Sequence, residues 1–189
     1  MSQTRTRILE AAEELLGERG PAGLTFDAVA ARVGVSKQAV LYWFPGKTQL
    51  MAAVALSLLR AEADTAIGAA EAAPDSLAAR GAVVEALIGF HRADLARFRQ
   101  MYAAPQLGPS PEWARDILDQ VHAITGEMYA AIARALGDGP KAREQAVALH
   151  MAALGHVLLT GLGEAVGDPL RHGPEALTHT LVGLLDGQG

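Results

Sequence analysis

The sequence predicts an all-α protein of about nine helices, and three observations favour this fold class. Alanine, the strongest helix former, supplies 38 of the 189 residues. Residues that favour strands are scarce, with four Phe and three Tyr in the chain. Clusters of Gly and Pro divide the sequence into segments whose apolar residues recur every three or four positions.

The N-terminal quarter is predicted to hold three short helices. An amphipathic segment runs from about residue 5 to 18, and the Gly/Pro cluster at 20–23 ends it. Two further helices are expected over 26–32 and 37–44, before a Pro-Gly break. We therefore place a first domain at residues 1–46.

The remaining residues, 47–189, are predicted to form a second domain of longer helices. The expected helices span about 47–73, 74–104, 111–136, 141–166 and 174–185.

The chain lacks cysteine, which excludes a disulfide framework and a cysteine nucleophile. Because its first residues lack the apolar core of a signal peptide, we expect a cytoplasmic protein.

Charge is distributed unevenly along the chain. The net charge is −5, yet residues 28–61 contain no Asp or Glu while holding Arg32, Lys37, Lys47 and Arg60. An acid-free segment inside an acidic protein indicates one local surface for an anionic partner.

The segment from Thr25 to Lys47 has the pattern of a helix-turn-helix. Ala30 is small where two helices would cross, and Gly34 permits a sharp turn with positive φ. Ser36 would cap the second helix, whose first turn would face the major groove of DNA. An ordinary helical hairpin would also fit this pattern.

Two lysines sharpen the interpretation of this segment as a DNA-binding motif. Lys37 follows the Ser36 cap, and Lys47 opens the next helix. A cation at these positions opposes the helix dipole, so neither lysine is placed for helix stability. Both suit a surface that holds phosphates.

Between Thr25 and Leu50 the sequence reads T-x-x-x-VA-x-x-VGVS-x-x-x-x-LY-x-F-x-x-K-x-x-L. This run, within residues 4–55, resembles the N-terminal DNA-binding region of the TetR family of transcriptional regulators. It departs from the usual family pattern at Val33 and Trp43. The resemblance implies three DNA-binding helices, followed by a body of six or more helices that binds a small ligand and forms a homodimer.

By position, the resemblance also implies the DNA contacts. Thr25, Tyr42 and Lys47 would contact phosphates, and Trp43 would pack inward or lie along the sugar-phosphate backbone. The residues at or near base edges would be Ser36, Lys37, Gln38 and Ala39. Among these side chains, Gln38 is able to read adenine through two hydrogen bonds.

The second domain offers candidates for a ligand pocket. His91 lies on an apolar stripe with Phe98, and Asp94 follows one turn on. A polar group in an apolar lining is typical of ligand sites, although a hydrogen-bonded core histidine gives the same pattern. The other candidates are Tyr102, Trp113, His122, Met128 and Tyr129. No motif indicates a metal, a cofactor or a catalytic nucleophile, so we expect none.

Residues 145–163 contain no Lys, Arg, Asp or Glu, a length that could span a membrane. Polar residues interrupt the run and Ala and Gly dominate it, so we expect no membrane contact. The expected partner is the same helix of a second subunit. The predicted dimer interface comprises Leu149, Ala152, Gly155, Leu158, Leu159, Leu181 and Leu184.

Together these patterns predict a homodimeric repressor that a small apolar or amphipathic ligand releases from a palindromic double-stranded DNA operator. One alternative is an all-α enzyme that uses His91 and Asp94 as an acid/base pair and has no DNA affinity. Another is a regulator that needs no ligand, for which a tightly packed body without a cavity would be expected.

Overall fold

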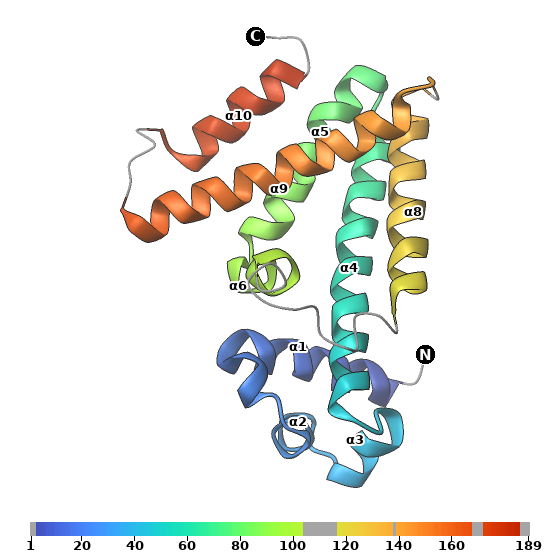
Figure 1. Ribbon diagram of the computed structural model, residues 1–189, viewed down its shortest axis with the longest axis vertical. Coiled ribbons are helices and arrows are strands. Elements are labelled where there is room, and N and C mark those ends of the chain that lie inside the picture. The colour runs from blue at the N-terminus through green and yellow to red at the C-terminus, as the bar shows by residue number, and fades with distance from the viewer. Residues whose placement is uncertain (1–2, 104–116, 138, 168–171, 186–189) are drawn as a thin grey trace. The chain divides into compact units, whose positions relative to one another are not determined.

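A computed structural model describes residues 3–103, 117–137, 139–167 and 172–185. These residues form helices and include no strand, which confirms the all-α prediction (Figure 1). The chain divides into two compact units. Unit 1 consists of Met1–Leu59 with Arg99–Val121, and unit 2 of Arg60–Phe98 with His122–Gly189.

Unit 1 begins with the helices α1 (Gln3–Gly23), α2 (Phe26–Val33) and α3 (Lys37–Trp43). The backbone of α1 leaves helical geometry at Gly20, whose φ of 64° lies in the left-handed region that glycine tolerates. The Gly/Pro cluster therefore interrupts α1 at the predicted place, although a helical turn resumes beyond it.

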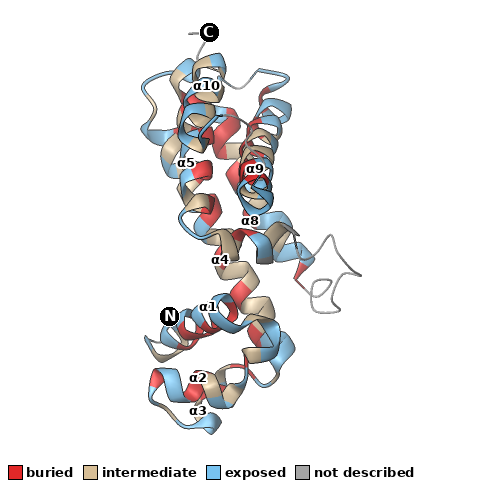
Figure 2. Ribbon diagram, turned by 90° about the vertical axis from the view of Figure 1, so that its left-hand side faces the viewer, coloured by how far each residue is buried: buried red, intermediate tan, exposed pale blue. Residues whose placement is uncertain are grey.

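The core of unit 1 is made by α1, α2, α3 and the first part of α4 (Lys47–Ala72). Its side chains are aliphatic apart from one phenylalanine, and Figure 2 marks their buried positions along the ribbon. The largest members are Ile8, Leu15, Leu24, Val29, Val40, Phe44, Leu50, Val54 and Leu58.

Unit 2 contains the second part of α4 together with α5 (Ser76–Arg92), α6 (Leu95–Phe98), α9 (Ala142–Val166) and α10 (Pro174–Leu185). Both α9 and α10 pack against α5 (Figure 1). The helix α8 (Leu118–Ala135) belongs mainly to this unit. By length and composition α9 could cross a membrane, but buried core helices meet the same criteria, and 39% of its apolar window is buried.

The prediction of one continuous helix over 74–104 is wrong. The helix α5 ends at Arg92, a short α6 follows, and a π-helix occupies Arg99–Ala103. The break arises because the Asp94 carboxylate accepts a hydrogen bond from the Arg97 backbone N–H at 2.9 Å, which starts a new helix. The Arg97 guanidinium also donates to the Phe90 carbonyl in the last turn of α5.

The other predicted helices agree closely with the structure where it describes them. The helix α10 has the predicted bounds, α9 begins one residue later than expected, and α4 ends one residue earlier. The predicted start of the helix over 111–136 lies outside the described residues, so only its later part, α8, can be compared.

Candidate nucleic-acid interface and buried polar network

The turn between α2 and α3 follows from three capping residues. The Thr25 hydroxyl accepts from the Ala28 N–H at 3.1 Å at the start of α2, and the Ser36 hydroxyl accepts from the Ala39 N–H at 3.2 Å at the start of α3. Between them Gly34 ends α2 with a φ of 76°. The predicted helix-turn-helix is therefore confirmed in its local geometry.

The short helix α3 is held from one side and presents its polar residues on the other. Val40 is buried in the unit 1 core, whereas Lys37 and Gln38 are exposed. Tyr42 is 77% exposed, and its ring meets the edge of the half-buried Trp43 ring at a centroid distance of 5.2 Å. A phenol this exposed is available to a partner.

Both arginines in the acid-free segment are held by carboxylates of their own unit. Arg32 contacts Glu14 at 2.8 Å and Glu18 at 2.7 Å, and its hydrogen bond lowers the pKa of Glu18. Arg60 contacts Glu127 at 2.7 Å, which raises the pKa of Arg60. The surface available to an anion therefore depends on the two lysines.

The two lysines have different partners. The Lys47 ammonium donates to the Pro21 carbonyl at 2.7 Å, so its charge is not neutralised by that contact. The Lys37 ammonium lies 2.9 Å from the Asp27 carboxylate, which forms an ion pair with it. A hollow of about 220 Å³ beside these groups is lined by Leu24, Thr25, Phe26, Asp27, Lys37, Lys47 and Leu50.

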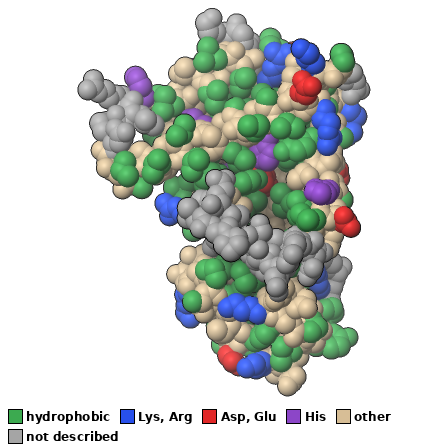
Figure 3. Space-filling view, in the orientation of Figure 1, with side chains coloured by type: hydrophobic (Ala, Val, Ile, Leu, Met, Phe, Trp, Pro, Cys, Tyr) green, Lys and Arg blue, Asp and Glu red, His purple; other side chains and the backbone are tan. Residues whose placement is uncertain are grey.

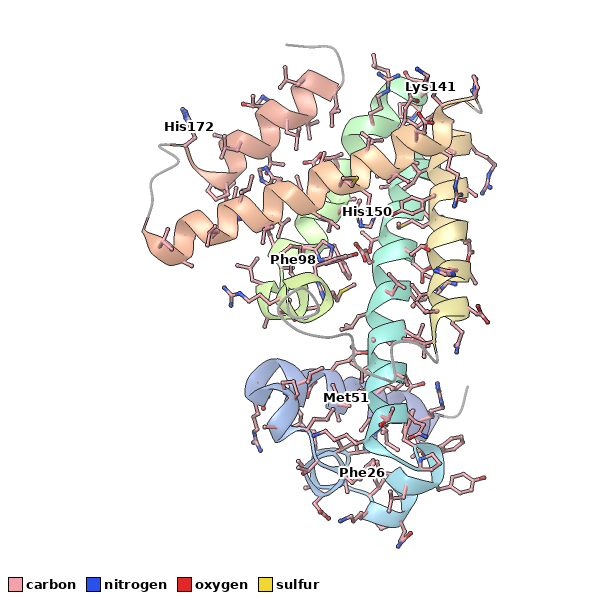
Figure 4. All side chains as sticks on the ribbon, in the orientation of Figure 1. Phe26, Met51, Phe98, Lys141, His150 and His172 are labelled. Atoms are coloured by element: carbon pink, nitrogen blue, oxygen red, sulfur yellow. The ribbon has the colours of Figure 1, made fainter. Side chains whose placement is uncertain are left out.

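Unit 2 contains a buried polar network centred on Glu62 of α4. One Glu62 carboxylate oxygen lies 3.0 Å from Nε2 of His91 on α5 and 2.9 Å from Nε2 of His150 on α9. The Tyr129 hydroxyl on α8 reaches Nδ1 of His150 at 2.8 Å. Four helices thus contribute to one network, and Figure 4 labels His150 and the nearby Phe98.

The carboxylate of Glu62 sets the direction of two of these hydrogen bonds. An ionised Glu62 can only accept, so both Nε2 atoms carry hydrogen and donate to it. The roles of Nδ1 of His150 and the Tyr129 hydroxyl depend on the histidine tautomer. Burial, and then the negative charge of Glu62, raise the pKa of Tyr129, so its hydroxyl stays protonated.

The structure gathers only some of the predicted ligand residues. His91 and Phe98 are buried with their rings 5.2 Å apart, and Met128 is also buried in unit 2. The remaining candidates are placed differently: Asp94 and His122 are exposed, Tyr129 and Tyr102 are half-buried with Tyr102 in unit 1, and Trp113 lies outside the described residues.

The N-terminal geometry agrees with a comparison of the sequence with known families. Residues 8–54 match the model of the bacterial regulatory proteins of the tetR family. Residues 8–54 are therefore similar to the N-terminal DNA-binding domain of the TetR family. The matched residues contain most of α1, all of α2 and α3, and the first turns of α4. The match supports a transcription regulator whose DNA-binding domain is the helix-turn-helix of α2 and α3.

Solved structures resemble the regulator over nearly its whole length, whereas no curated protein matches it. A protein of unknown function from Rhodococcus sp. RHA1 is 19% identical, with a TM-score of 0.73 over 99% of this chain and 95% of that one. A transcriptional regulator from the same organism is 23% identical (TM-score 0.66; 97% and 94% covered). A TetR/AcrR-family regulator from Thermobifida fusca YX-ER1 is 21% identical (TM-score 0.66; 98% and 97% covered). At these identities the likeness shows the shared fold.

The sequence interpretation missed two members of the regulator's buried network, Glu62 and His150. The sequence held a signal for Glu62, because Glu62 lies four residues after Leu58 and four before Ala66 in a series of buried positions on α4. His150 lies in the uncharged run of α9 and shares its buried face with Ala153. Within the described residues, no cluster of three side chains is suited to hold a metal ion.

The predicted interface residues of the regulator fall into two groups. Leu158, Leu159 and Leu184 are exposed, while Ala152, Gly155 and Leu181 are half-buried. Leu149 is only 6% exposed and therefore belongs to the core of its own subunit rather than to an outer face. Figure 3 shows hydrophobic side chains over α9 and α10, and the exposed ones on α9 also include Met151, Leu162 and Val166.

Proposed function

We propose that this chain is a TetR-family regulator, a homodimeric repressor that a small ligand releases from a palindromic operator. The observation that carries the DNA-binding half is the capped α2–α3 turn, which leaves Gln38, Tyr42 and Lys47 exposed on an acid-free segment. Two such motifs can occupy successive major grooves only if a dimer holds them about 34–36 Å apart.

A binding titration tests the DNA half of the proposal. The probes are a labelled fragment from upstream of the regulator's own gene and a scrambled fragment of the same length and composition, each at two salt concentrations. We expect tighter binding to the upstream fragment and weaker binding to both fragments at high salt. Equal affinity for the two fragments at both salt concentrations would contradict an operator in that region.

The ligand half of the proposal rests on the buried network. A carboxylate, two imidazoles and the half-buried phenol of Tyr129 meet in a core whose other buried side chains, among the described residues, are apolar apart from Thr160. Such a network costs stability unless every member is satisfied, and a few convergent polar groups in an apolar lining are typical of ligand sites. We infer that the network supplies the polar contact for an otherwise apolar molecule.

Three probes of equal chain length test this inference: a straight-chain alcohol, a primary amine and a fatty acid. Because the network already holds the Glu62 carboxylate, we expect the alcohol or the amine to raise the melting temperature and weaken DNA binding. The fatty acid should have less effect, since it would bring a second negative charge near the first. Failure of all three probes would favour the regulator that needs no ligand.

His91 gives a more specific test of the same inference. We expect His91→Gln, which keeps an N–H donor for Glu62, to retain DNA binding while weakening the response to the effective probe. His122→Leu on the exposed surface of α8 serves as the control and should respond like wild type. A large loss of melting temperature with a normal probe response would show that His91 is a structural histidine.

The enzyme alternative needs His91 and Asp94 to act as a pair. The His91 ring contacts Glu62 in the core, whereas the exposed Asp94 carboxylate caps α6 through the Arg97 N–H. No observation therefore favours the enzyme over the regulator.

A further inference from the structure

The ion pair between Asp27 and Lys37 lies within the DNA-binding motif itself. Asp27 is the second residue of α2 and Lys37 the first residue of α3. Their charged atoms are 2.9 Å apart, and both side chains are more than half exposed. The pair borders the 220 Å³ hollow that Thr25 and Lys47 also line.

Asp27 directly precedes the acid-free segment, and the next acidic residue along the chain is Glu62. Its carboxylate therefore neutralises one of the two lysines on which an anion-binding surface depends. Lys47 differs in this respect, since its partner is the neutral carbonyl of Pro21. A phosphate that approaches Lys37 must compete with a carboxylate of the same charge sign.

We propose that Asp27 limits the DNA affinity of this regulator by competing with a DNA phosphate for Lys37. This inference rests on the proposed DNA-binding function and goes beyond it, because it assigns an affinity-setting role to an acidic residue. Exposed ion pairs are weak, so the carboxylate tunes binding by about two- to fivefold rather than abolishing it. Because phosphate contacts are independent of sequence, the effect is the same for specific and non-specific DNA.

A double-mutant cycle tests the proposal. Dissociation constants are measured across a salt series for wild type, Asp27→Asn, Lys37→Ala and the double variant, on the upstream and scrambled fragments. We expect Asp27→Asn to tighten binding to both fragments about two- to fivefold. The freed lysine should also steepen the dependence of log affinity on log salt by about 0.9. In the Lys37→Ala background the same change should have no effect.

Two controls separate this effect from general charge and folding effects. Glu10→Gln removes one negative charge from an exposed position on α1 and should tighten binding much less than Asp27→Asn. Thermal melts of each variant show that unit 1 remains folded, and Asp27→Ser provides a second uncharged variant at the same position.

Several outcomes would overturn the proposal. An equal gain with and without Lys37 would mean a general charge effect, and no gain would mean that the carboxylate does not compete. Weaker binding by Asp27→Asn would mean that Asp27 itself contacts a base, as a carboxylate does with the cytosine amino group. A wild-type chain that binds neither fragment would overturn both this inference and the proposed function.

Discussion

The Lys47 ammonium donates a hydrogen bond to the Pro21 carbonyl. Because this carbonyl is neutral, the contact leaves the positive charge of Lys47 uncompensated. We expect Lys47→Ala to weaken binding to all DNA sequences alike and to flatten the salt dependence by about one unit. Titrations at several salt concentrations measure both effects. Lys141→Ala, which removes an exposed lysine from unit 2, is the matched control. An unchanged slope for Lys47→Ala would rule out a phosphate contact.

Gln38 is predicted to act differently, because an amide can read a base edge whereas an ammonium contacts phosphate as a point charge. We expect Gln38→Ala to change which sequence binds best, with a loss of ~1–3 kcal/mol at one operator position. Competition among single-base operator variants measures this preference. Gln49→Ala on the exposed surface of α4 provides the comparison. A uniform loss across all variants would place Gln38 on the backbone instead.

Among the elements, α9 and α10 are joined by a pH-sensitive contact. Nε2 of His156 on α9 lies 3.0 Å from the Thr178 hydroxyl on α10. Burial, and then the positive charge of Arg92, lower the pKa of His156 below its ordinary value of 6.5. The unfolded chain therefore takes up a proton at a higher pH than the folded chain does.

This difference gives a stability contribution that is complete above pH 6.5 and is lost as the pH falls towards the lowered pKa. We expect His156→Gln, which keeps a hydrogen-bonding side chain, to show a smaller fall in unfolding free energy over that range. Chemical denaturation of both proteins at a series of pH values checks the prediction. Parallel pH curves for the two proteins would contradict it.

Element boundaries set by local chemistry could be predicted from the sequence, whereas tertiary pairings could not. Gly34 and Ser36 specify the α2–α3 turn because a left-handed residue and a capping hydroxyl act within a few residues. The break after Arg92 was missed because the apolar spacing continues through it, although Asp94 is a capping residue. The Glu62 contacts with His91 and His150 join residues 29 and 88 positions apart, so no local pattern reveals them.

At the scale of the whole molecule, the exposed apolar residues of α9 and α10 form the surface that the proposed dimer would cover. We expect Ala152→Glu, on the half-buried side of this surface, to disrupt the proposed dimer because two like charges would be buried near the twofold axis. Sedimentation at micromolar concentration should show a dimer for wild type and monomers or aggregates for the variant. The variant should also lose operator affinity.

Leu77→Glu is the control for this experiment, because Leu77 is an exposed leucine at the start of α5. It adds the same acidic side chain outside α9 and α10, and the protein should remain dimeric. If the wild-type protein were monomeric, it would carry one helix-turn-helix and could not occupy both half-sites of a palindromic operator. A tight dimer of Ala152→Glu would place the interface elsewhere on the surface.

The buried stripe of α4 has one more consequence. Leu50, Val54 and Leu58 serve the core of unit 1, and the same four-residue spacing continues through Glu62, Ala66 and Ala70 in unit 2. Each residue added to a helix turns the later part of that helix by about 100°, so one residue inserted between Glu62 and Ala66 would turn Ala66 and Ala70 out of line with Glu62. Seven inserted residues would restore the phase to within about 20°. Within unit 2, the spacing of buried positions along α4 is therefore constrained by angle more strictly than by distance, and natural or engineered insertions there should be tolerated only when they complete whole turns.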